Sequence, residues 1–446
     1  MAEKIAFVSL GCPKNQVDAE QMLYTLKTAG YEIVAEEEKA DVIIINTCGF
    51  IEDAKREAIE NIIEAARYKE EGNLKLLVVT GCLAERYRDD ITEEIPEVDM
   101  VVGIGSNGKI AELVRDALAG NLQNSYGEKF SLDLDGKRIL GGVPYSAYIK
   151  IADGCDNCCT YCAIPRIRGR FRSRKMEGIL EEVRELAANG VTELTVVAQD
   201  TTAYGVDIYG EYKLAELLRE LCKIEGIRWI RTLYTYPDKI TDELLDALRT
   251  EEKLCKYLDI PLQHSEDAVL KRMNRKGTKA DIEKTLERIR AAVPEITLRT
   301  TFISGFPGET EEDHEALCEF IKKWRFDRLG VFPYSAEEDT PAAEFDCQVA
   351  EQTKIDRSEQ IMAEQLTIVE QKMAEKIGTV QEILIEGYDD YIKCYYGRSR
   401  ADAPEVDGKV FFLAHRPLII GDYVQVEIND SIEYDLLGEM IDESAE

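Results

Sequence analysis

The sequence predicts an α/β protein in three parts: an N-terminal doubly wound parallel sheet, a central partial (βα)6 barrel and a small C-terminal β-barrel. Two observations predict the first two parts. Strand-length apolar runs alternate with helical patterns up to about residue 335, and the central part of this rhythm repeats about six times. Such alternation is typical of parallel sheets covered by helices, and six units are too few for a closed eight-stranded barrel. The third observation is a change after residue 376 to short strands and turns, which indicates a small barrel.

Composition limits the class of protein. The 446 residues are 45% hydrophobic and 32% charged, so the chain is globular, and no apolar run approaches the length needed to span a bilayer. The start lacks a signal-peptide pattern, so we expect a cytoplasmic protein. In that reducing compartment, 12 cysteines suggest metal binding or catalysis rather than disulfides. A net charge of −32 argues against general binding to phosphate backbones and favours a basic partner.

Residues 1–120 form the first predicted domain. Apolar runs at 5–10, 42–45, 76–80 and 100–102 predict its strands, and patterns at 17–29, 51–70 and 109–119 predict its helices. Residues 121–144 are rich in Gly, Asn, Asp and Ser and are interpreted as a linker.

Three cysteines stand at matching positions in this first domain. Cys12, Cys48 and Cys82 each follow the carboxyl end of a predicted strand. Ligands of open α/β sheets bind outside those ends, so the three thiols can meet in space and hold a cluster. The glycine beside each cysteine would let the backbone approach a bulky group. The alternative is that each cysteine is a small buried hydrophobe.

A second cysteine group lies in the loop after the first strand of the central domain, residues 145–374. Cys155, Cys159 and Cys162 have C-x3-C-x2-C spacing, which can hold three corners of a 4Fe–4S cluster and leave one iron open to a chelating ligand. Zinc is the alternative, because Cys158 completes two C-x2-C pairs; zinc ribbons, however, separate their pairs by about 15–20 residues. We interpret Cys158 as a non-ligand.

Polar residues follow other central strands, predicted at 146–151, 194–198, 229–234, 257–261, 297–304 and 328–332. The intervening helices are expected at 176–189, 213–223, 242–250, 279–292 and 311–324, and a longer helix at 350–376. Gln199, Asp200, Thr201, His264 and the 304–309 loop can face the same edge as the second cysteine group. Capping explains Asp200 and Thr201 about as well, and a structural role is favoured for His264.

The remaining features are less specific. The basic run 166–175 can clamp an acidic group, or it can be solvated or salt-bridged. Five single cysteines are interpreted as packing residues: Cys222, Cys255, Cys318, Cys347 and Cys394.

The C-terminal domain, residues 375–446, is acidic. Its strands are expected at 378–386, 392–396, 409–413 and 423–428, and it holds seventeen Asp or Glu against six Lys or Arg. Such a barrel repels phosphates and attracts a basic protein. The alternative is a cap that contributes only stability.

The chain resembles the methylthiotransferases of the radical S-adenosylmethionine superfamily over nearly its whole length. The resemblance rests on the order of three features: the strand-end cysteines, the C-x3-C-x2-C loop and the terminal barrel. The strings Ser9-Leu-Gly-Cys-Pro-Lys-Asn-Gln-Val-Asp18, Ala152-Asp-Gly-Cys-Asp-Asn157 and Ala163-Ile-Pro-Arg-Ile-Arg-Gly169 are similar to the RimO branch, which modifies an aspartate of ribosomal small-subunit protein twelve. The transfer RNA branch typically has Gln-Met-Asn where this chain has Pro-Lys-Asn after Cys12, and Thr-Arg-Gly after the cluster loop.

The resemblance implies a TRAM-like terminal barrel, two 4Fe–4S clusters and S-adenosylmethionine. The radical-generating cluster would be held by Cys155, Cys159 and Cys162, and a sulfur-carrying cluster by Cys12, Cys48 and Cys82. An electron from a reducing donor would split the cofactor and give a 5′-deoxyadenosyl radical. This radical would remove a hydrogen from the aspartate β-carbon. A second S-adenosylmethionine would supply the methyl group. Candidate cofactor-binding residues are Tyr161, Gln199, Arg299 and Gly305.

Two other functions are weighed against this one. A transfer RNA methylthiotransferase acting on a modified adenosine would use the same cofactors, but the acidic terminal barrel argues against transfer RNA as a partner. A non-catalytic iron–sulfur electron carrier or a zinc-stabilised RNA-binding module would not need a six-unit barrel with polar strand ends.

Overall fold

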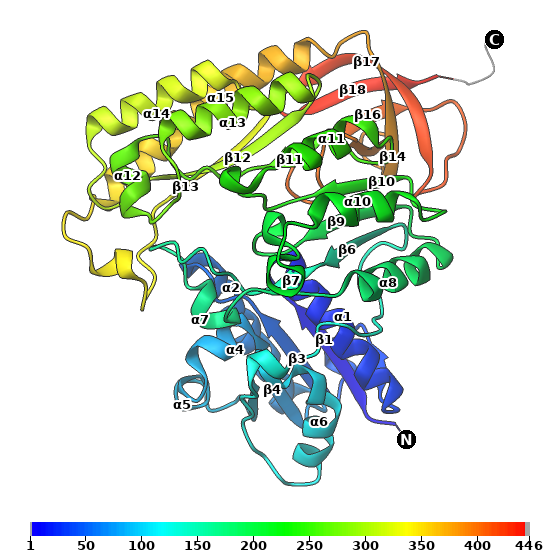
Figure 1. The fold of residues 1–446 in the computed structure, drawn as a ribbon. Coiled ribbons are helices and arrows are strands. Elements are labelled where there is room, and N and C mark those ends of the chain that lie inside the picture. The colour runs from blue at the N-terminus through cyan, green and yellow to red at the C-terminus, as the bar shows by residue number, and fades with distance from the viewer. Residues whose placement is uncertain (1, 442–446) are drawn as a thin grey trace.

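The computed structural model describes residues 2–441 and begins with a five-stranded parallel sheet of order β2-β1-β3-β4-β5 (Figure 1). The carboxyl ends of its strands therefore lie along one edge. Its strands are β1 Lys4–Ser9, β2 Glu32–Val34, β3 Val42–Thr47, β4 Leu76–Gly81 and β5 Met100–Val102. Its helices are α1 Pro13–Thr28, α2 Glu52–Ala66, α3 Tyr68–Glu71, α4 Cys82–Tyr87, α5 Asp90–Glu94 and α6 Ile110–Leu118.

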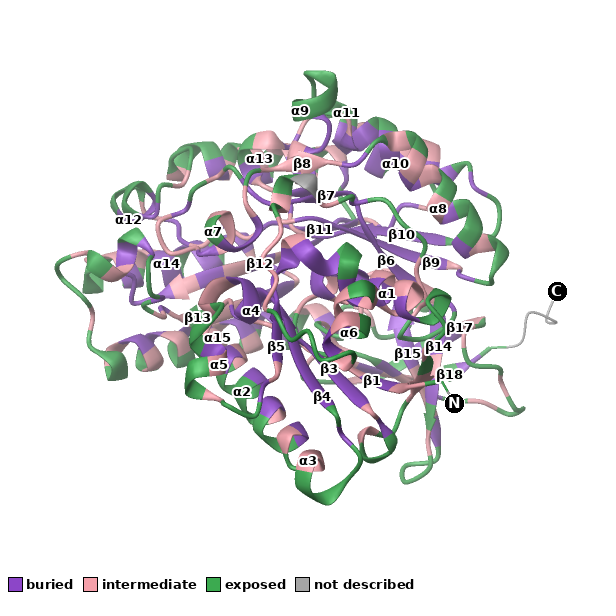
Figure 2. Cartoon of the chain, turned by 90° about the horizontal axis from the view of Figure 1, so that it is seen from below, coloured by how far each residue is buried: buried purple, intermediate pink, exposed green. Residues whose placement is uncertain are grey.

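Both faces of this sheet are covered by helices. Every residue of β3 is buried: Ile43 and Ile45 belong to a core with α2, and Val42 and Ile44 belong to a separate core with α1 and α6. Figure 2 shows β3 and β4 as buried along their lengths. A strand covered on both faces needs a continuous apolar run, which is what the sequence contains. The predicted doubly wound sheet is confirmed.

The central part holds six parallel strands in two sheets of three, ordered β10-β9-β6 and β11-β12-β13. A hydrogen bond from the Thr235 amide to the Asp259 carbonyl, 2.9 Å long, joins the sheets and continues the partial barrel. The strands are β6 Ser146–Lys150, β9 Glu193–Val197, β10 Trp229–Thr232, β11 Tyr257–Asp259, β12 Thr297–Ser304 and β13 Arg328–Pro333. The outer helices are α8 Met176–Ala188, α10 Leu214–Cys222, α11 Asp242–Thr250, α13 Lys279–Ala292 and α14 Glu311–Trp324.

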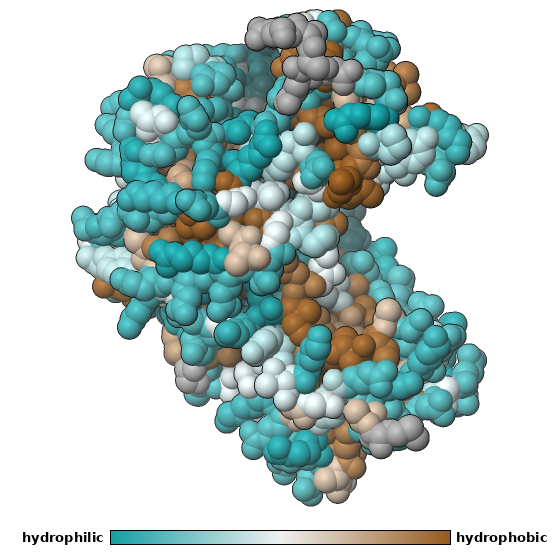
Figure 3. Space-filling model, turned by 90° about the vertical axis from the view of Figure 1, so that its right-hand side faces the viewer, coloured by the Kyte–Doolittle hydropathy of each residue, from teal (hydrophilic) through white to brown (hydrophobic). Residues whose placement is uncertain are grey.

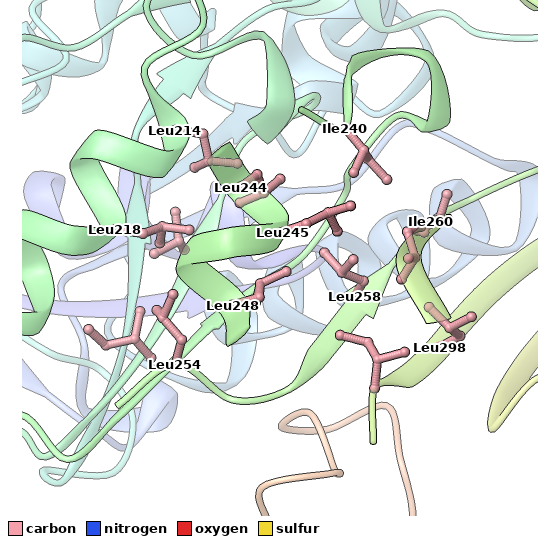
Figure 4. Packing of buried hydrophobic residues seen from close by; sticks show 14 of the residues in the cluster. Leu214, Leu218, Ile240, Leu244, Leu245, Leu248, Leu254, Leu258, Ile260 and Leu298 are labelled. Atoms are coloured by element: carbon pink, nitrogen blue, oxygen red, sulfur yellow. The ribbon is translucent and has the colours of Figure 1, made fainter. Parts of the chain in front are cut away.

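Leucine and isoleucine side chains pack the helices onto these strands. In Figure 4, Leu214 and Leu218 of α10 and Leu245 of α11 lie in one cluster that extends to Leu258 of β11 and Leu298 of β12. The apolar stripes of the helices face inward and close this core, as the helical periodicity of the sequence predicts.

Short elements decorate the barrel edge. They are the paired strands β7 Ala152–Asp153 and β8 Arg172–Ser173, with α7 Ile164–Arg168, α9 Val206–Tyr209 and α12 Asp267–Arg272. Residues 121–144 run along the surface of both larger parts. Arg138 fixes them, because its guanidinium forms ion pairs of 2.7 Å with Glu20 and 2.8 Å with Glu182.

The long helix α15 Glu351–Ala374 leads to a closed five-stranded barrel of order β14-β15-β16-β18-β17. Its strands are β14 Val380–Asp389, β15 Cys394–Ser399, β16 Val410–Leu413, β17 Tyr423–Ile432 and β18 Asp435–Met440. The predicted small barrel is confirmed. No helix within residues 2–441 is long and apolar enough to cross a membrane.

The C-terminal barrel covers the amino ends of the central strands. Its side chains meet the first residues of four of those strands: Arg398 pairs with Glu193 at 2.6 Å, the Trp229 indole donates to Glu382 at 2.9 Å, the Tyr257 hydroxyl donates to Asp407 at 2.6 Å, and Arg328 pairs with Asp402. The opposite, carboxyl ends therefore remain the face available for a site.

The sequence missed some short elements and overextended one helix. Strand β2 is a three-residue, partly exposed edge strand, and β18 follows a turn in a polar segment. The helix predicted at 51–70 ends at Ala66, and α3 follows as a separate turn. Neither α4 nor α5 was predicted, because each is too short to show a helical period.

Candidate active site

The three N-terminal cysteines lie at the same edge of the first sheet. Cys12 precedes α1, Cys48 follows β3, and Cys82 is the first residue of α4, directly after β4. Strands β1, β3 and β4 are neighbours in the sheet, so the three loops adjoin. Burial raises the pKa of Cys82 to about 12, and the nearby Cys12 and Cys48 thiols act in the same direction. The thiols are therefore close enough to interact electrostatically.

Two glycines allow these loops to approach one another. Gly81 has φ +92°, and a Cβ there would lie 2.5 Å from the Thr47 carbonyl oxygen; a Cβ at Gly11, at φ +98°, would lie 2.9 Å from the Cys48 Cβ. The sequence suggested that these glycines admit a bulky cluster. The structure shows a different need, because they first let one strand-end loop pack against the next.

The second cysteine group lies on the loop between β7 and α7. Cys155 and Cys159 are buried and Cys162 is partly buried, whereas Cys158 is exposed and has φ +53°. Burial raises the pKa of Cys155 to about 11, with Cys159 acting in the same direction. The same two causes raise the pKa of Cys162. This placement agrees with Cys158 as the residue outside the group.

Each cysteine group offers three thiols as metal ligands. Within residues 2–441, no group of three or more His, Cys, Asp or Glu side chains is placed to hold one metal ion. Sulfurs sharing one zinc stand roughly 4 Å apart, since each bond is about 2.3 Å long. In a 4Fe–4S cluster each thiolate binds a different iron, so three thiols are a donor set that such a cluster can use. Both cysteine groups have this donor chemistry.

A buried network of charges connects the two cysteine groups. The Arg168 guanidinium donates to Asp18 at 2.7 Å and to Asp153 at 3.2 Å, and its other nitrogen lies 3.5 Å from the Cys82 sulfur. Lys150 forms ion pairs with the same two carboxylates. All four charged side chains are at most 3% exposed. The network therefore fixes the first sheet against the central barrel, with Arg168 beside one of the candidate cluster ligands.

The loop after β10 reaches both cysteine groups. The Tyr236 hydroxyl lies 3.4 Å from the Cys159 sulfur, and the Arg275 guanidinium stacks on the Tyr236 ring at 4.2 Å. Two residues earlier, the Tyr234 ring lies 3.5 Å from the ammonium of Lys14, a residue two positions after Cys12. Figure 3 shows the molecular surface hollowed between its lower part, which holds the first sheet, and its upper part.

The four candidate cofactor residues have different surroundings. Tyr161 packs edge-on against Phe306 with ring centroids 6.3 Å apart, and burial raises its pKa. The Gln199 amide donates to Asp153 at 3.1 Å. Arg299 pairs with Asp259 at 3.0 Å. The Gly305 amide donates to Glu309 at 2.8 Å. Their cofactor roles stay predictions.

Other polar residues serve the structure. Asp200 accepts a hydrogen bond from the Ala203 amide, which confirms the capping alternative, and its carboxylate also pairs with Lys239. His264 is buried and accepts a hydrogen bond from the Glu266 amide at 3.1 Å, which agrees with the favoured structural role.

The basic run 166–175 is salt-bridged rather than free. Arg170 pairs with Asp156 at 2.7 Å, and Arg174 pairs with Asp135 at 2.7 Å. Four of the single cysteines are buried, as a packing role requires, but Cys347 is exposed, so the packing interpretation is wrong for that residue. Its neighbours in sequence are mostly polar or charged, which gave no reason to expect burial.

Sequence reasoning missed several residues of this site. Lys14, Asn15 and Asp18 were quoted only within a motif, yet all three are buried. The Asn15 amide donates to the Leu10 carbonyl at 2.8 Å and to the Thr47 carbonyl at 3.2 Å, so it ties two cysteine loops together. Their spacing on the first turns of α1, directly after Cys12, was the available signal. Tyr236 and Arg275 carried no comparable signal.

Comparison with family models assigns all three parts. Residues 4–103 match the uncharacterized protein family UPF0004, residues 149–321 match the radical SAM superfamily, and residues 377–441 match the TRAM domain.

Full-length relatives are similar throughout. The chain is 51% identical to the ribosomal protein uS12 methylthiotransferase RimO of Thermoanaerobacter sp. (strain X514), over 98% of this chain and 100% of that protein. It is 48% identical to the RimO of Acetivibrio thermocellus, over 100% of both chains. It is 47% identical to the RimO of Geobacter sulfurreducens, over 98% of this chain and 99% of that one.

Solved structures share the fold at low identity. The radical S-adenosylmethionine methyltransferase TsrM from Kitasatospora setae, with cobalamin and a [4Fe-4S] cluster bound, matches with a TM-score of 0.56 and 15% identity over 77% of each chain. The cobalamin-dependent S-adenosylmethionine radical enzyme OxsB, with aqua-cobalamin and S-adenosylmethionine bound, matches with a TM-score of 0.55 and 14% identity over 82% of this chain and 58% of that chain.

Proposed function

The chain belongs to the RimO family of radical S-adenosylmethionine methylthiotransferases, and we propose that it inserts sulfur and a methyl group at the β-carbon of an aspartate of ribosomal protein uS12. The observation that carries the proposal is the presence of two cysteine triads linked by one loop, which contacts Cys159 of one triad and Lys14, two residues after Cys12 of the other. A sulfur-inserting enzyme needs one site to activate the substrate carbon and another to supply sulfur.

Membership of the radical SAM superfamily implies one 4Fe–4S cluster and S-adenosylmethionine. We propose that Cys155, Cys159 and Cys162 hold this cluster, and that Cys12, Cys48 and Cys82 hold a second. When bound, these groups supply the hydrogen-abstracting radical and the sulfur. Tyr161, Gln199, Arg299 and Gly305 are the proposed cofactor-binding residues.

The chain's own residues then position and shield the chemistry. Arg168 and Lys150 hold the two halves of the site together through Asp18 and Asp153. Arg275 holds the Tyr236 ring against the Cys159 thiol. The C-terminal barrel covers the amino ends of the central strands and shields that end of the partial barrel. Exclusion of water protects a reactive intermediate.

Charge supports a basic protein as the substrate. The C-terminal domain carries seventeen acidic and six basic residues, so it attracts a basic ribosomal protein and repels transfer RNA. A reducing electron donor is also required, and a cytoplasmic setting follows from a ribosomal substrate.

The test is anaerobic reconstitution followed by iron, sulfide and Mössbauer analysis of the wild type and of a Cys155→Ala/Cys159→Ala/Cys162→Ala variant. We expect about eight irons per chain to fall to about four. A drop from about four to none would remove the second cluster from the proposal. Purified uS12 and transfer RNA, assayed side by side by mass spectrometry, then identify the substrate; modification of transfer RNA alone would overturn the proposed function.

A further inference from the structure

Lys14 is a buried cation without a described carboxylate partner. The residue is 8% exposed, and within residues 2–441 its ammonium forms no ion pair with a carboxylate. Its described partner is the Tyr234 ring, 3.5 Å away. A cation–π contact offsets only part of the free-energy cost of taking an ammonium out of water. The position is therefore costly unless an anion enters beside it.

The position of Lys14 lies between the two cysteine triads. It stands in the first turn of α1, two residues after Cys12. The Tyr234 ring comes from the loop after β10, and the same loop carries the Tyr236 hydroxyl to 3.4 Å from the Cys159 sulfur. Lys14 therefore lies beside the N-terminal triad and contacts the loop that also reaches Cys159.

Neighbouring cations are already occupied. Arg168 is paired with Asp18 and Asp153. Lys239 is paired with Asp200. Arg275 donates to the Pro261 carbonyl at 2.6 Å and lies on the Cys159 side of the loop. Lys14 is the cation of this group that lies in the first domain without a described carboxylate partner. Burial acts to raise the pKa of the nearby Cys12 thiol, but the Lys14 charge helps to hold it below its ordinary value.

We propose that Lys14 binds the carboxylate of the substrate aspartate and thereby selects an acidic side chain. This inference rests on the proposed function and names the contact that makes the substrate an aspartate. The carboxylate carbon is bonded directly to the β-carbon, so an ion pair there holds the reacting carbon one bond from a fixed anchor. Charge-assisted hydrogen bonds of this type are about twice as strong as neutral ones.

The competing explanation is that Lys14 only offsets negative charge on the nearby cysteine triad. The two explanations differ in which group depends on the Lys14 charge. A contact with the substrate couples Lys14 to the substrate carboxylate alone. A contact with the triad changes the cluster and affects all substrates equally.

The experiment is a double-mutant cycle on reconstituted enzyme without reductant, so that binding is measured without turnover. The enzymes are the wild type, Lys14→Met and Lys14→Arg. The substrates are uS12 with its target aspartate and uS12 with asparagine at that position. The control is Lys27→Met, an exposed lysine in the last turn of the same helix that changes net charge equally.

We expect the wild type and Lys27→Met to bind the aspartate form at least tenfold more tightly than the asparagine form. Lys14→Met should bind both forms alike, and Lys14→Arg should recover part of the preference. Iron content and absorption spectra should match in all four enzymes. In a separate turnover assay with reductant and S-adenosylmethionine, Lys14→Met should raise KM more than it lowers kcat.

Equal preference for the aspartate form in the wild type and Lys14→Met would overturn the inference. So would a Lys14→Met variant that loses iron and weakens binding of both forms to the same degree, because the cation would then serve the triad. Failure of the proposed function is separate: the wild type itself would leave uS12 unmodified in the presence of reductant and S-adenosylmethionine.

Discussion

Arg168→Met should separate the first sheet from the central barrel. The guanidinium lies between Asp18 of α1 and Asp153 of β7, and it also donates to the Asn15 side chain at 3.2 Å. Methionine keeps the length and apolar stem of the side chain. It leaves two buried carboxylates with Lys150 as their remaining cation.

The size of the effect follows from burial. Removing one partner of a buried ion pair destabilises by about 3–5 kcal/mol, because the other charge stays desolvated. Since Lys150 still contacts both carboxylates, we expect the lower end of this range. About 3 kcal/mol corresponds to roughly a hundredfold increase in the opening equilibrium of the interface.

Hydrogen exchange measured by mass spectrometry can follow this opening in peptides from α1 and from the segment containing β6 and β7. The matched control is Arg166→Met in the same short helix, because Arg166 pairs with Asp339 at the surface and both side chains are more than 60% exposed. Exposed pairs contribute about 0–1 kcal/mol. If Arg168→Met accelerates exchange no more than Arg166→Met does, the buried network does not hold the two halves together.

Three further changes test other parts of the structure. Gly81→Ala should destabilise the first domain by about 1–3 kcal/mol in urea unfolding, since φ is +92° and the new Cβ would lie 2.5 Å from the Thr47 carbonyl; unchanged unfolding would contradict this. Cys158→Ser should retain the iron content of the wild type after reconstitution, because the thiol is exposed; loss of about four irons would make it a ligand. Burial acts to raise the pKa of Glu193, but the Arg398 guanidinium holds it below its ordinary range. The C-terminal barrel of the wild type should therefore stay docked below the unfolded carboxyl pKa of about 4.3 and undock as the pH falls through the lowered pKa of Glu193. The Arg398→Met variant should undock at a higher pH. Hydrogen exchange of peptides from β14 and β15 would report the undocking.

The elements were predictable where local signals are strong. The bounds of α13 and α14 agree with the sequence prediction, and in the structure each helix begins at a capping box formed by Thr278 or Thr310 with an aspartate three residues later. Strand β12 was predicted residue for residue from its alternating pattern. Strand β2 escaped prediction because Glu32 and its neighbours are partly exposed and make up one edge of the sheet.

The candidate site was predictable only in part. The strand-end positions of the six cysteines follow from the order of strands along the chain. The charges around them do not, because Arg168 meets Asp18 across 150 positions in the sequence. A run of arginines after a cysteine loop favours a solvated or ligand-binding interpretation until tertiary structure supplies the carboxylates. Arg299 shows the same limit, since its second carboxylate, Asp407, comes from the C-terminal barrel.

Arg168 and Lys14 occupy the same interface and should nevertheless behave in opposite ways. Arg168 has two carboxylates, so its removal leaves unpaired charge in the folded protein and the loss appears as stability. Lys14 has none, so its removal relieves a desolvated charge, and the loss appears when the substrate binds. Lys14→Met should therefore be as stable as the wild type or slightly more stable, and still fail to distinguish aspartate from asparagine. Urea unfolding of the two variants, set beside the binding cycle, separates a cation that holds the protein together from one that is kept free for a ligand. If Lys14→Met is destabilised as strongly as Arg168→Met, Lys14 belongs to the structural network.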